Sequence, residues 1–250
     1  MKIVVCVKFV PDTATKIKIA PNGNEVDVAD VTFVVNPYDE FAVEEALKIK
    51  EKLGGDVVVV GAGSEQASAG LRTCLAMGAD SAILVGDPSL EKADSYVIGS
   101  VLAHVCRSLS PDLILFGKHA IGVDNGQVPA VVAEQLNLPQ ASVVTKLDVQ
   151  DKSFRAERDI EGACEVIEGS LPAVITAQKG LNVPRYASLK GIMAAKNKPI
   201  EEQAAAPAER LVEILAMRKP AGKAAGRIIG TDKTAVAELV RLLHEEAKVI

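Results

Sequence analysis

A glycine-rich loop in the middle of the chain carries the residues best suited to chemistry. The stretch FGKHAIGVDNGQVP (116–129) follows an apolar run and precedes a helical pattern. Its glycines, Gly117, Gly122 and Gly126, allow a ligand to approach the backbone closely. Pro129 is tolerated only in the first turn of a helix, so we expect the helix to begin near Gly126. The first amides of that helix lack acceptors within it and would suit a phosphate.

Two interpretations of this loop stay open from the residues alone. Either a phosphate binds the helix amides, or Asp124 or Asn125 simply caps the helix. The loop matches neither GxGxxG nor the P-loop pattern, so the motif is not specific in itself. Two other loops, KFVPDTATKI (8–17) and VVNPYDE (34–40), are expected beside it, because ligands of open α/β sheets bind outside the carboxyl ends of the strands.

The sequence offers no catalytic constellation. No Ser/His/Asp order and no cluster of metal ligands stands out, so no metal site is expected. We expect His119 to form a hydrogen bond within its loop, and His104 and His244 to lie at helix surfaces. The 4 cysteines show no CxxC spacing and are expected to be reduced and mostly buried, in a cytoplasmic protein.

Composition limits the class of protein and its partners. The 250 residues suffice for one large α/β domain or two small ones, and 48% hydrophobic with 3% aromatic residues is typical of parallel sheets covered by helices. A net charge of −5 argues against nucleic acid. No apolar run approaches the roughly 20 residues of a membrane span. The first ten residues predict a strand rather than a signal peptide, so no membrane insertion is expected.

Strand and helix patterns alternate over the first two-thirds of the chain. The expected strands cover residues 3–9, 56–63, 81–86 and 112–117, and the expected helices cover 38–55, 64–79, 93–109 and 128–136. In the first helix, Ala42, Ala46 and Leu53 are expected on one buried face. Glu44 and Lys48 should pair on the opposite, solvent-facing side. The β-α-β-α order predicts a doubly wound, largely parallel, Rossmann-like α/β sheet.

The pattern changes after residue 140. Residues 141–178 predict three or four strands with short turns, which form an added β region. Residues 199–226, rich in Ala, Pro and Gly, predict an extended C-terminal arm, and residues 232–249 predict a terminal helix with Asp232 as a candidate cap. These features describe a nucleotide-binding α/β protein. A stand-alone, stress-type nucleotide-binding homodimer would share this fold but would give residues 141–198 no role.

An apolar segment follows the last predicted strand of the body. In LNVPRYASLKGIMAAK (181–196), Pro184 stiffens the entry, and Leu189, Ile192 and Met193 fall at helical spacing on one stripe. The simplest role of such a stripe is to pack on the body, which we expect for Ile192 and Met193.

Several sequence blocks resemble one known family. They are NPYDEFAVEEALKIKE, LAMGAD, GKHAIGVDNGQV and ERDIEGACEVIEGSLPAVITAQKGLNVPRYASLKGIMAAK, and they are similar to the β subunit of electron-transfer flavoprotein. The match runs in order from Met1 to about Lys198, and LPAVIT followed by LNVPRYASL is its most specific part. The resemblance implies a nucleotide-binding domain over residues 1–198, with a docking loop at 184–196. It also implies an arm and helix over 199–250 that pack on an α subunit.

The resemblance also implies cofactors and partners. The redox-active FAD is held mainly by the α subunit, and the heterodimer carries electrons without substrate turnover of its own. Acyl-CoA-type or other flavin dehydrogenases supply the electrons, and a membrane quinone oxidoreductase accepts them. The β subunit binds a structural AMP in most members and a second FAD in electron-bifurcating members. The implied pocket residues are Val7, Lys8, Asn36, Pro37, Tyr38, Asp39, Gly61, Gly63, Gly117, Lys118, Ala120, Asp124, Asn125, Gly126, Gln127 and Val128.

The glycine-rich loop departs from the family pattern at the phosphate. AMP-binding members commonly have Thr where this chain has Val128, whereas bifurcating members have Val there, and Pro129 fits neither group. Gly122 and Val123 replace two carboxylates, which eases the binding of an anion. The loop thus suits a phosphate, with AMP and FAD as alternatives.

Further roles follow from the same resemblance. Tyr38 and the loop around Asp12–Thr13 would approach the flavin of the α subunit. Glu165 resembles an acidic residue that holds or releases the mobile flavin domain. Leu189 matches an anchor leucine that inserts into a partner dehydrogenase, and the docking surface would comprise Tyr186, Leu189, Ile192 and Met193.

Overall fold

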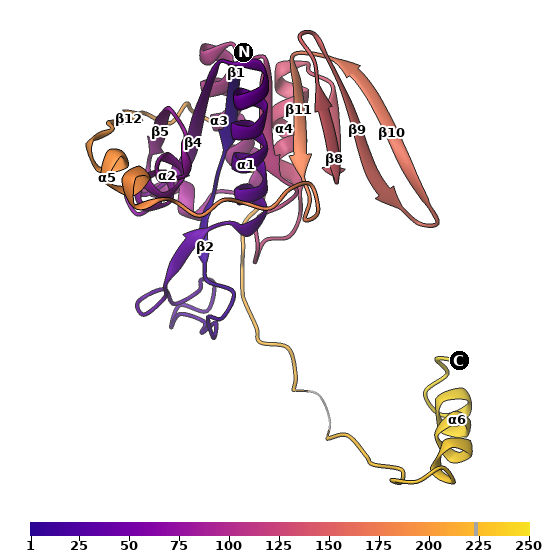
Figure 1. Ribbon diagram of the computed structural model, residues 1–250. Helices are drawn as coiled ribbons and strands as arrows, with labels where there is room; N and C mark the ends of the chain where they lie inside the picture. Colours follow the sequence, from indigo (N-terminus) through magenta and orange to yellow (C-terminus); the bar gives the residue numbers. More distant parts are fainter. Residues whose placement is uncertain (223–224) are drawn as a thin grey trace. The chain divides into compact units, whose positions relative to one another are not determined.

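A seven-stranded sheet forms the body of the protein in the computed structural model, which describes residues 1–222 and 225–250 (Figure 1). The strand order is β12-β5-β4-β1-β6-β11-β7, and all neighbours pair in parallel. The strands are β1 (Lys2–Cys6), β4 (Asp56–Gly63), β5 (Ser81–Gly86), β6 (Leu113–Gly117), β7 (Gln140–Val144), β11 (Ala173–Ala177) and β12 (Ile200–Gln203). The predicted α/β class and doubly wound parallel sheet are confirmed.

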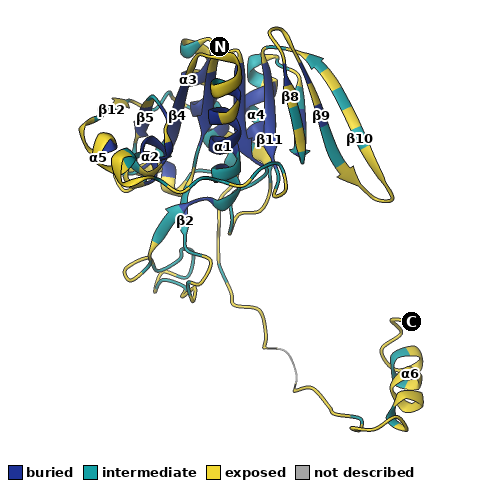
Figure 2. Ribbon diagram, viewed as in Figure 1, coloured by how far each residue is buried: buried dark blue, intermediate teal, exposed yellow. Residues whose placement is uncertain are grey.

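Helices cover both faces of this sheet. Helices α1 (Pro37–Leu53) and α2 (Ala67–Met77) pack on one face, and α3 (Ser95–Leu109) and α4 (Gln127–Leu136) pack on the other. Successive side chains of β1 alternate between the faces: Ile3 and Val5 join the core of α1 and α2, whereas Val4 and Cys6 join that of α3 and α4. The central strands are therefore buried on both sides (Figure 2).

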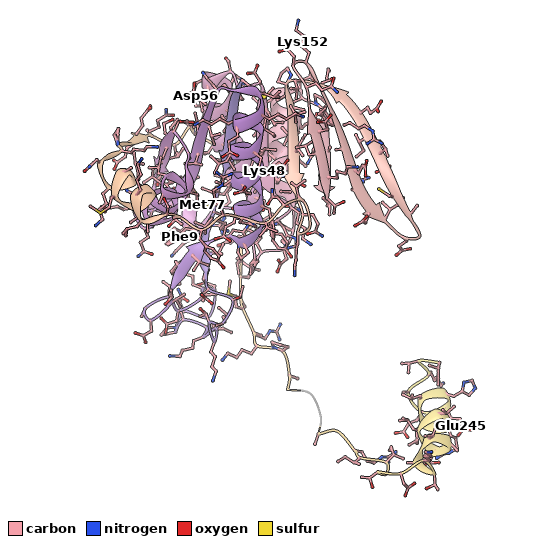
Figure 3. All side chains as sticks on the ribbon, viewed as in Figure 1. Phe9, Lys48, Asp56, Met77, Lys152 and Glu245 are labelled. Atoms are coloured by element: carbon pink, nitrogen blue, oxygen red, sulfur yellow. The ribbon has the colours of Figure 1, made fainter. Side chains whose placement is uncertain are left out.

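The winding of the chain changes direction beside β1. From β1 the chain proceeds to β4 and then β5 on one side, and it reaches β6 on the other side only after α3. In such sheets a ligand binds outside the carboxyl ends of the strands at this reversal. Asp56, which begins β4, and Phe9, which begins β2 (Phe9–Pro11) beyond the end of β1, lie at opposite ends of the sheet (Figure 3).

The added β region contains more strands than its pattern predicts. Strands β8 (Lys146–Val149), β9 (Ser153–Ile160) and β10 (Ala163–Ser170) form a separate antiparallel sheet. Residues 141–178 were expected to hold three or four strands, but β7 and β11 join the parallel sheet, so five strands lie in or across this range. A short antiparallel pair, β2 with β3 (Phe33–Val35), extends beyond the end of β1.

Helix α1 differs from its prediction on one face. Glu44 is only 5% exposed and binds Arg185, whereas Lys48 pairs with Glu45. Leu53, predicted on the buried face, is 39% exposed at the end of the helix. The predicted solvent-facing Glu44–Lys48 pair is therefore wrong, because Asn182 and Arg185 bind the carboxylates on that face of α1.

The body continues beyond residue 198. Helix α5 (Leu189–Asn197) leads into β12, which pairs with β5, and the first compact unit comprises Met1–Lys18 and Val26–Leu215. Asp94 fixes the last part of this unit: one oxygen caps α3 at the Val97 amide, and the other accepts from the amides of Leu211 at 2.6 Å and Val212 at 2.8 Å.

A second unit comprises Ile19–Glu25 and the described residues from Ala216 to the end of the chain. It contains α6 (Ala235–Glu245), which begins after Thr234. The carboxylate of Asp232, the predicted cap, accepts from the Thr234 amide at 2.8 Å. Hydrogen bonds from the side chain and amide of Thr234, together with a backbone hydrogen bond from Ala235, the first residue of α6, hold the pKa of Asp232 below its usual value. Val236, Leu239 and Val240 of α6 are exposed.

Candidate functional site

The predicted pocket residues gather at one edge of the sheet, the edge formed by the carboxyl-terminal ends of its central strands. Val7 and Lys8 follow β1, Gly61 and Gly63 lie in the last part of β4, and Gly117 ends β6. Residues 36–39 begin α1, and residues 118–126 connect β6 to α4. The Val7 amide continues the pairing with β4 by donating to the Val60 carbonyl at 2.9 Å. The structure thus brings three strand ends and two helix beginnings together.

The carboxylate of Asp39 joins three of these elements. Asp39 is 5% exposed, and its Oδ2 accepts from the Lys8 amide at 2.7 Å. Its Oδ1 accepts from the Gly117 amide at 3.0 Å and from Nδ2 of Asn36 at 2.9 Å. One side chain near the start of α1 therefore holds the ends of the adjacent strands β1 and β6.

Asn36 fixes the glycine-rich loop (116–129) to the start of α1. Its side chain is fully buried, and Nδ2 donates to the His119 carbonyl at 2.9 Å as well as to Asp39. Its Oδ1 accepts from the Ile121 amide at 3.2 Å. Both amide hydrogens are thus used inside the protein, so Asn36 contributes to the site by positioning the loop.

Two glycines of the loop meet different requirements. A Cβ on Gly117 would lie 2.4 Å from Oδ1 of Asp39 and 2.6 Å from the backbone carbon of Tyr38, so only glycine lets β6 reach Asp39 this closely. Gly126 has φ +60°, in the left-handed region that favours glycine. It is the N-cap of α4, and the expected helix start near Gly126 is confirmed.

Asn125 occupies the first amide of α4. Its Oδ1 accepts from the Gln127 amide at 3.3 Å, and its Nδ2 donates to Oγ of Ser95, at the start of α3, at 2.8 Å. Asp124 does not cap the helix: its Oδ1 lies 3.2 Å from Nε2 of His119, and its Oδ2 accepts from the Gly122 amide at 3.3 Å. The loop interaction predicted for His119 is thus present.

Apolar and aromatic groups shape the rest of the edge. The Val128 side chain packs against the core of α3 and α4 and offers no polar group to a ligand. The Tyr38 ring meets the His119 ring edge-on with centroids 4.8 Å apart, and Nζ of Lys118 lies 4.7 Å from the Tyr38 centroid. Pro37 is the first residue of α1, and the Ala120 carbonyl accepts from Asp124 within the loop. The edge therefore combines a cation, an aromatic ring and a helix N-terminus, a set that suits a nucleotide with its phosphate.

The docking segment, defined as residues 184–196, exposes its apolar side chains. Tyr186 is 98% exposed, Leu189 79%, Met193 58% and Ile192 42%. The expected packing of Ile192 and Met193 on the body is therefore not complete. Helix α5 rests on α2 through Gly191 instead, where a Cβ would lie 2.3 Å from the Ala76 carbonyl oxygen.

Glu165 lies on β10, directly opposite Arg158 of β9, and the two side chains form an ion pair. Both side chains are partly exposed. Because of this ion pair, the Glu165 carboxylate already has a partner within its own sheet. Arg155 and Glu168 form the next pair along the same two strands, at 3.5 Å.

The cysteines and the histidines outside the loop lie on several different elements, although the buried thiols of Cys6 and Cys106 contact each other. The four cysteines are free; Cys6, Cys74 and Cys106 are buried, and Cys164 is exposed. Burial raises the pKa of the Cys6 and Cys74 thiols, which makes them poor nucleophiles. His104 and His244 lie exposed on helices. Among residues 1–222 and 225–250, no group of three or more His, Cys, Asp or Glu side chains could hold a metal ion. Within the same ranges, no helix is long and apolar enough to cross a membrane.

Comparisons with known proteins agree with the resemblance seen in the sequence blocks. A family model described as "Electron transfer flavoprotein domain" matches residues 25–208. "Electron transfer flavoprotein subunit beta" of Bacillus subtilis is 42% identical over 259 residues, covering 100% of both chains. The protein of that name from Bradyrhizobium diazoefficiens is 40% identical, and "Electron transfer flavoprotein subunit beta, mitochondrial" of Oryza sativa is 36% identical, each again over 100% of both chains.

Titration of Asp39 gives a prediction for stability. Burial raises the pKa of Asp39 to about 7, although the hydrogen bonds from Lys8, Asn36 and Gly117 act to lower it. Between about pH 4 and 7 the unfolded carboxyl is ionised while the folded one keeps its proton, so raising the pH through this window lowers stability. We expect the free energy of unfolding, relative to that of Asp39→Asn, to fall by up to about 1.4 kcal/mol per pH unit. Urea unfolding of both proteins from pH 4.5 to 8 measures this, and a difference that does not vary with pH would contradict it.

Proposed function

Because the chain belongs to the electron transfer flavoprotein β-subunit family, we propose that it is the β subunit of a heterodimeric electron carrier whose pocket binds a structural AMP. The α subunit would hold most of the redox-active FAD, which supplies the electron-transfer chemistry. The β subunit would support that flavin through Tyr38 and the loop at Asp12–Thr13. Electrons would come from acyl-CoA-type or other flavin dehydrogenases and pass to a membrane quinone oxidoreductase.

The observation that carries the nucleotide proposal is the junction of β1, β6 and the start of α4. The N-terminus of α4 presents amides and the positive end of the helix dipole, and both favour a phosphate. Asp39 and Asn36 fix the approach to this helix with buried hydrogen bonds. We place the phosphate on the amides of Gly126 to Val128, with Lys118 as the nearby cation and the Tyr38 ring as an apolar wall for the nucleotide. The phosphate would replace Oδ1 of Asn125 at the Gln127 amide, where the present bond is long, at 3.3 Å.

A second FAD in the same pocket is the alternative, and Val128 favours it. This position carries no hydroxyl for a terminal phosphate, and its side chain packs on the core of α3 and α4. A pocket that relies on backbone amides alone can accept either the one phosphate of AMP or the two of FAD. In that case the chain would be the β subunit of an electron-bifurcating flavoprotein.

A stand-alone nucleotide-binding homodimer is disfavoured by the extent of the family match. The matching residues 25–208 include all of β8, β9 and β10 and the docking segment, for which that alternative has no use. We also propose that the arm and α6 pack on the α subunit, because Val236, Leu239 and Val240 form an exposed apolar group on α6. The compartment we propose is the cytoplasm, where the free cysteines would stay reduced.

The nucleotide proposal predicts one AMP per heterodimer and a loss of nucleotide affinity when a negative charge is introduced at Asn125. Asn125→Asp places a carboxylate beside the proposed phosphate and should weaken nucleotide retention by about 1–3 kcal/mol, the range for a perturbed charged hydrogen bond. Nucleotides released by denaturing the purified heterodimer are identified and counted by chromatography. Asn137→Asp, at the other end of α4, is the matched control and should retain AMP. Two flavins and no AMP per heterodimer would refute the AMP proposal and support bifurcation.

Glu165 is proposed to control the motion of the flavin domain by exchanging Arg158 for an arginine of the α subunit. A partly exposed ion pair contributes only about 0–1 kcal/mol, which suits a switch between nearly balanced states. Glu165→Ala should change electron-transfer rates and leave the melting temperature of the heterodimer nearly unchanged. Stopped-flow reduction by a dehydrogenase measures the rates, with Glu168→Ala as the control on the same strand. Equal kinetics for wild type and Glu165→Ala with every acceptor would rule out this role.

Leu189 is proposed to anchor the dehydrogenase. A buried leucine side chain contributes roughly 1.5–3 kcal/mol, and about 1.4 kcal/mol is a factor of ten in binding. Leu189→Ala should therefore lower turnover with a dehydrogenase at least about tenfold at limiting heterodimer, while FAD content and melting temperature stay near the wild-type values. Leu53→Ala, a partly exposed leucine on α1, serves as the control. If Leu189→Ala unfolds the subunit or releases the α subunit, the side chain supports the structure and the docking role fails.

A further inference from the structure

Two arginines hold the docking segment at its two ends. Arg185 lies at the entry, before the exposed Tyr186 and Leu189, and Arg72 of α2 reaches the exit, at the end of α5. Both make their contacts away from the exposed apolar side chains. Neither is among the residues that the sequence suggests for docking.

Arg185 joins the segment to α1 through two glutamates. Its backbone amide and Nε donate to Oε2 of Glu44 at 3.1 and 2.8 Å, and Nη2 donates to Oε1 at 3.0 Å. Nη1 donates to Glu51, about two helical turns further along α1, at 2.6 Å. The Glu44 side chain is only 7% exposed, so this pair is shielded from water and stronger than a surface pair. The planar guanidinium spans both carboxylates, a geometry that a lysine cannot reproduce.

Arg72 closes the other end. Its Nη1 donates to the carbonyl of Ala195 at 2.6 Å and also to that of Lys198, so a cation binds two carbonyls at the C-terminus of α5. The Ala195 carbonyl accepts from the Lys198 amide as well, at 3.3 Å. Lys198 adds a bond from Nζ to the Ala79 carbonyl at 2.6 Å. Between the two ends, Ser188 caps α5 by accepting from the Gly191 amide at 3.0 Å.

We propose that Arg185 and Arg72 are positioning residues that set the orientation of α5 before a partner arrives. This inference rests on the proposed docking function of the segment. An anchor side chain with few contacts of its own must be ordered on binding unless its backbone is already fixed, and that ordering weakens affinity. Here the backbone on both sides of Leu189 is tied to α1 and α2, so the exposed leucine is presented in one place.

The test uses the intact heterodimer and variants chosen to keep the fold. Removing Arg185 outright would strand the buried Glu44 carboxylate and could unfold the subunit. Arg185→Lys keeps the charge but cannot bridge Glu44 and Glu51, and Arg72→Met removes only the exit contact. Arg107→Met is the matched control, because Arg107 donates to the Gln135 carbonyl near the end of α4 and lies outside the docking segment.

Two measurements are made on each variant. Hydrogen exchange of peptides from residues 186–197 reports the order of α5, and steady-state kinetics with a purified acyl-CoA dehydrogenase that reduces the wild-type heterodimer report docking. We expect both Arg185→Lys and Arg72→Met to speed exchange about fivefold to tenfold and to raise the KM for the heterodimer by a similar factor, with kcat unchanged. Arg107→Met should change neither quantity.

The outcomes separate this inference from the proposed function. If Leu189→Ala raises KM but both arginine variants match the wild type, the docking function stands and the positioning role is overturned. Faster exchange with an unchanged KM would also overturn it, because order would then not matter for docking. If Leu189→Ala itself has no effect on KM, the proposed docking function fails, and the inference fails with it.

Discussion

A buried carboxylate holds the candidate pocket together. Asp39 accepts hydrogen bonds from the ends of β1 and β6 and from Asn36, which in turn binds the glycine-rich loop at His119 and Ile121. A backbone amide at the end of a buried strand needs an acceptor. The free-energy penalty for burying the amide unpaired is larger than the net stabilisation that one hydrogen bond provides. Asp39 supplies acceptors to two such amides at the point where the winding of the sheet reverses. The reversal that opens a ligand site thus also creates the unpaired groups that this side chain satisfies.

Helix α1 serves two regions at once. Its first turn carries Asn36 and Asp39 toward the pocket, and its buried flank carries Glu44 and Glu45 toward the docking segment. Asn182 and Arg185 reach those glutamates from residues about 140 positions later in the sequence. Part of the face of α1 that would be polar and solvent-exposed in an ordinary amphipathic helix is therefore buried. Its carboxylates are stable in their buried positions because a guanidinium and an amide are bound to them.

Local patterns predicted the elements well and their partners poorly. The ranges of β4 and β5 and the start of α4 at Gly126 follow from alternation, glycine and proline, all of which act over a few residues. The Glu44–Lys48 prediction failed because i, i+4 spacing is informative only where a helix face meets water. Asn36 and Asp39 were expected as pocket residues, but their buried bonds to Lys8, Gly117 and His119 join loops that no spacing rule connects. Arg72 had no signal in the sequence, since its partners are backbone carbonyls of a helix more than 120 residues away.

The two candidate sites use different parts of the chain, and this affects how each responds to sequence change. The candidate pocket is built from amides, carbonyls and buried side chains, and even Val128, at its proposed phosphate end, packs on the core of α3 and α4. The docking segment is built differently. Arg185 and Arg72 bind it at its two ends, and the surface proposed to contact a partner consists of exposed side chains. Substitution of those side chains should change the stability of the fold little. Substitution of Glu44 or Arg185 should lower it, because each would leave a buried charged partner unpaired. If the segment docks a dehydrogenase as proposed, specificity for that partner could change at Tyr186, Leu189 and Met193 without altering the helix that supports the proposed nucleotide pocket.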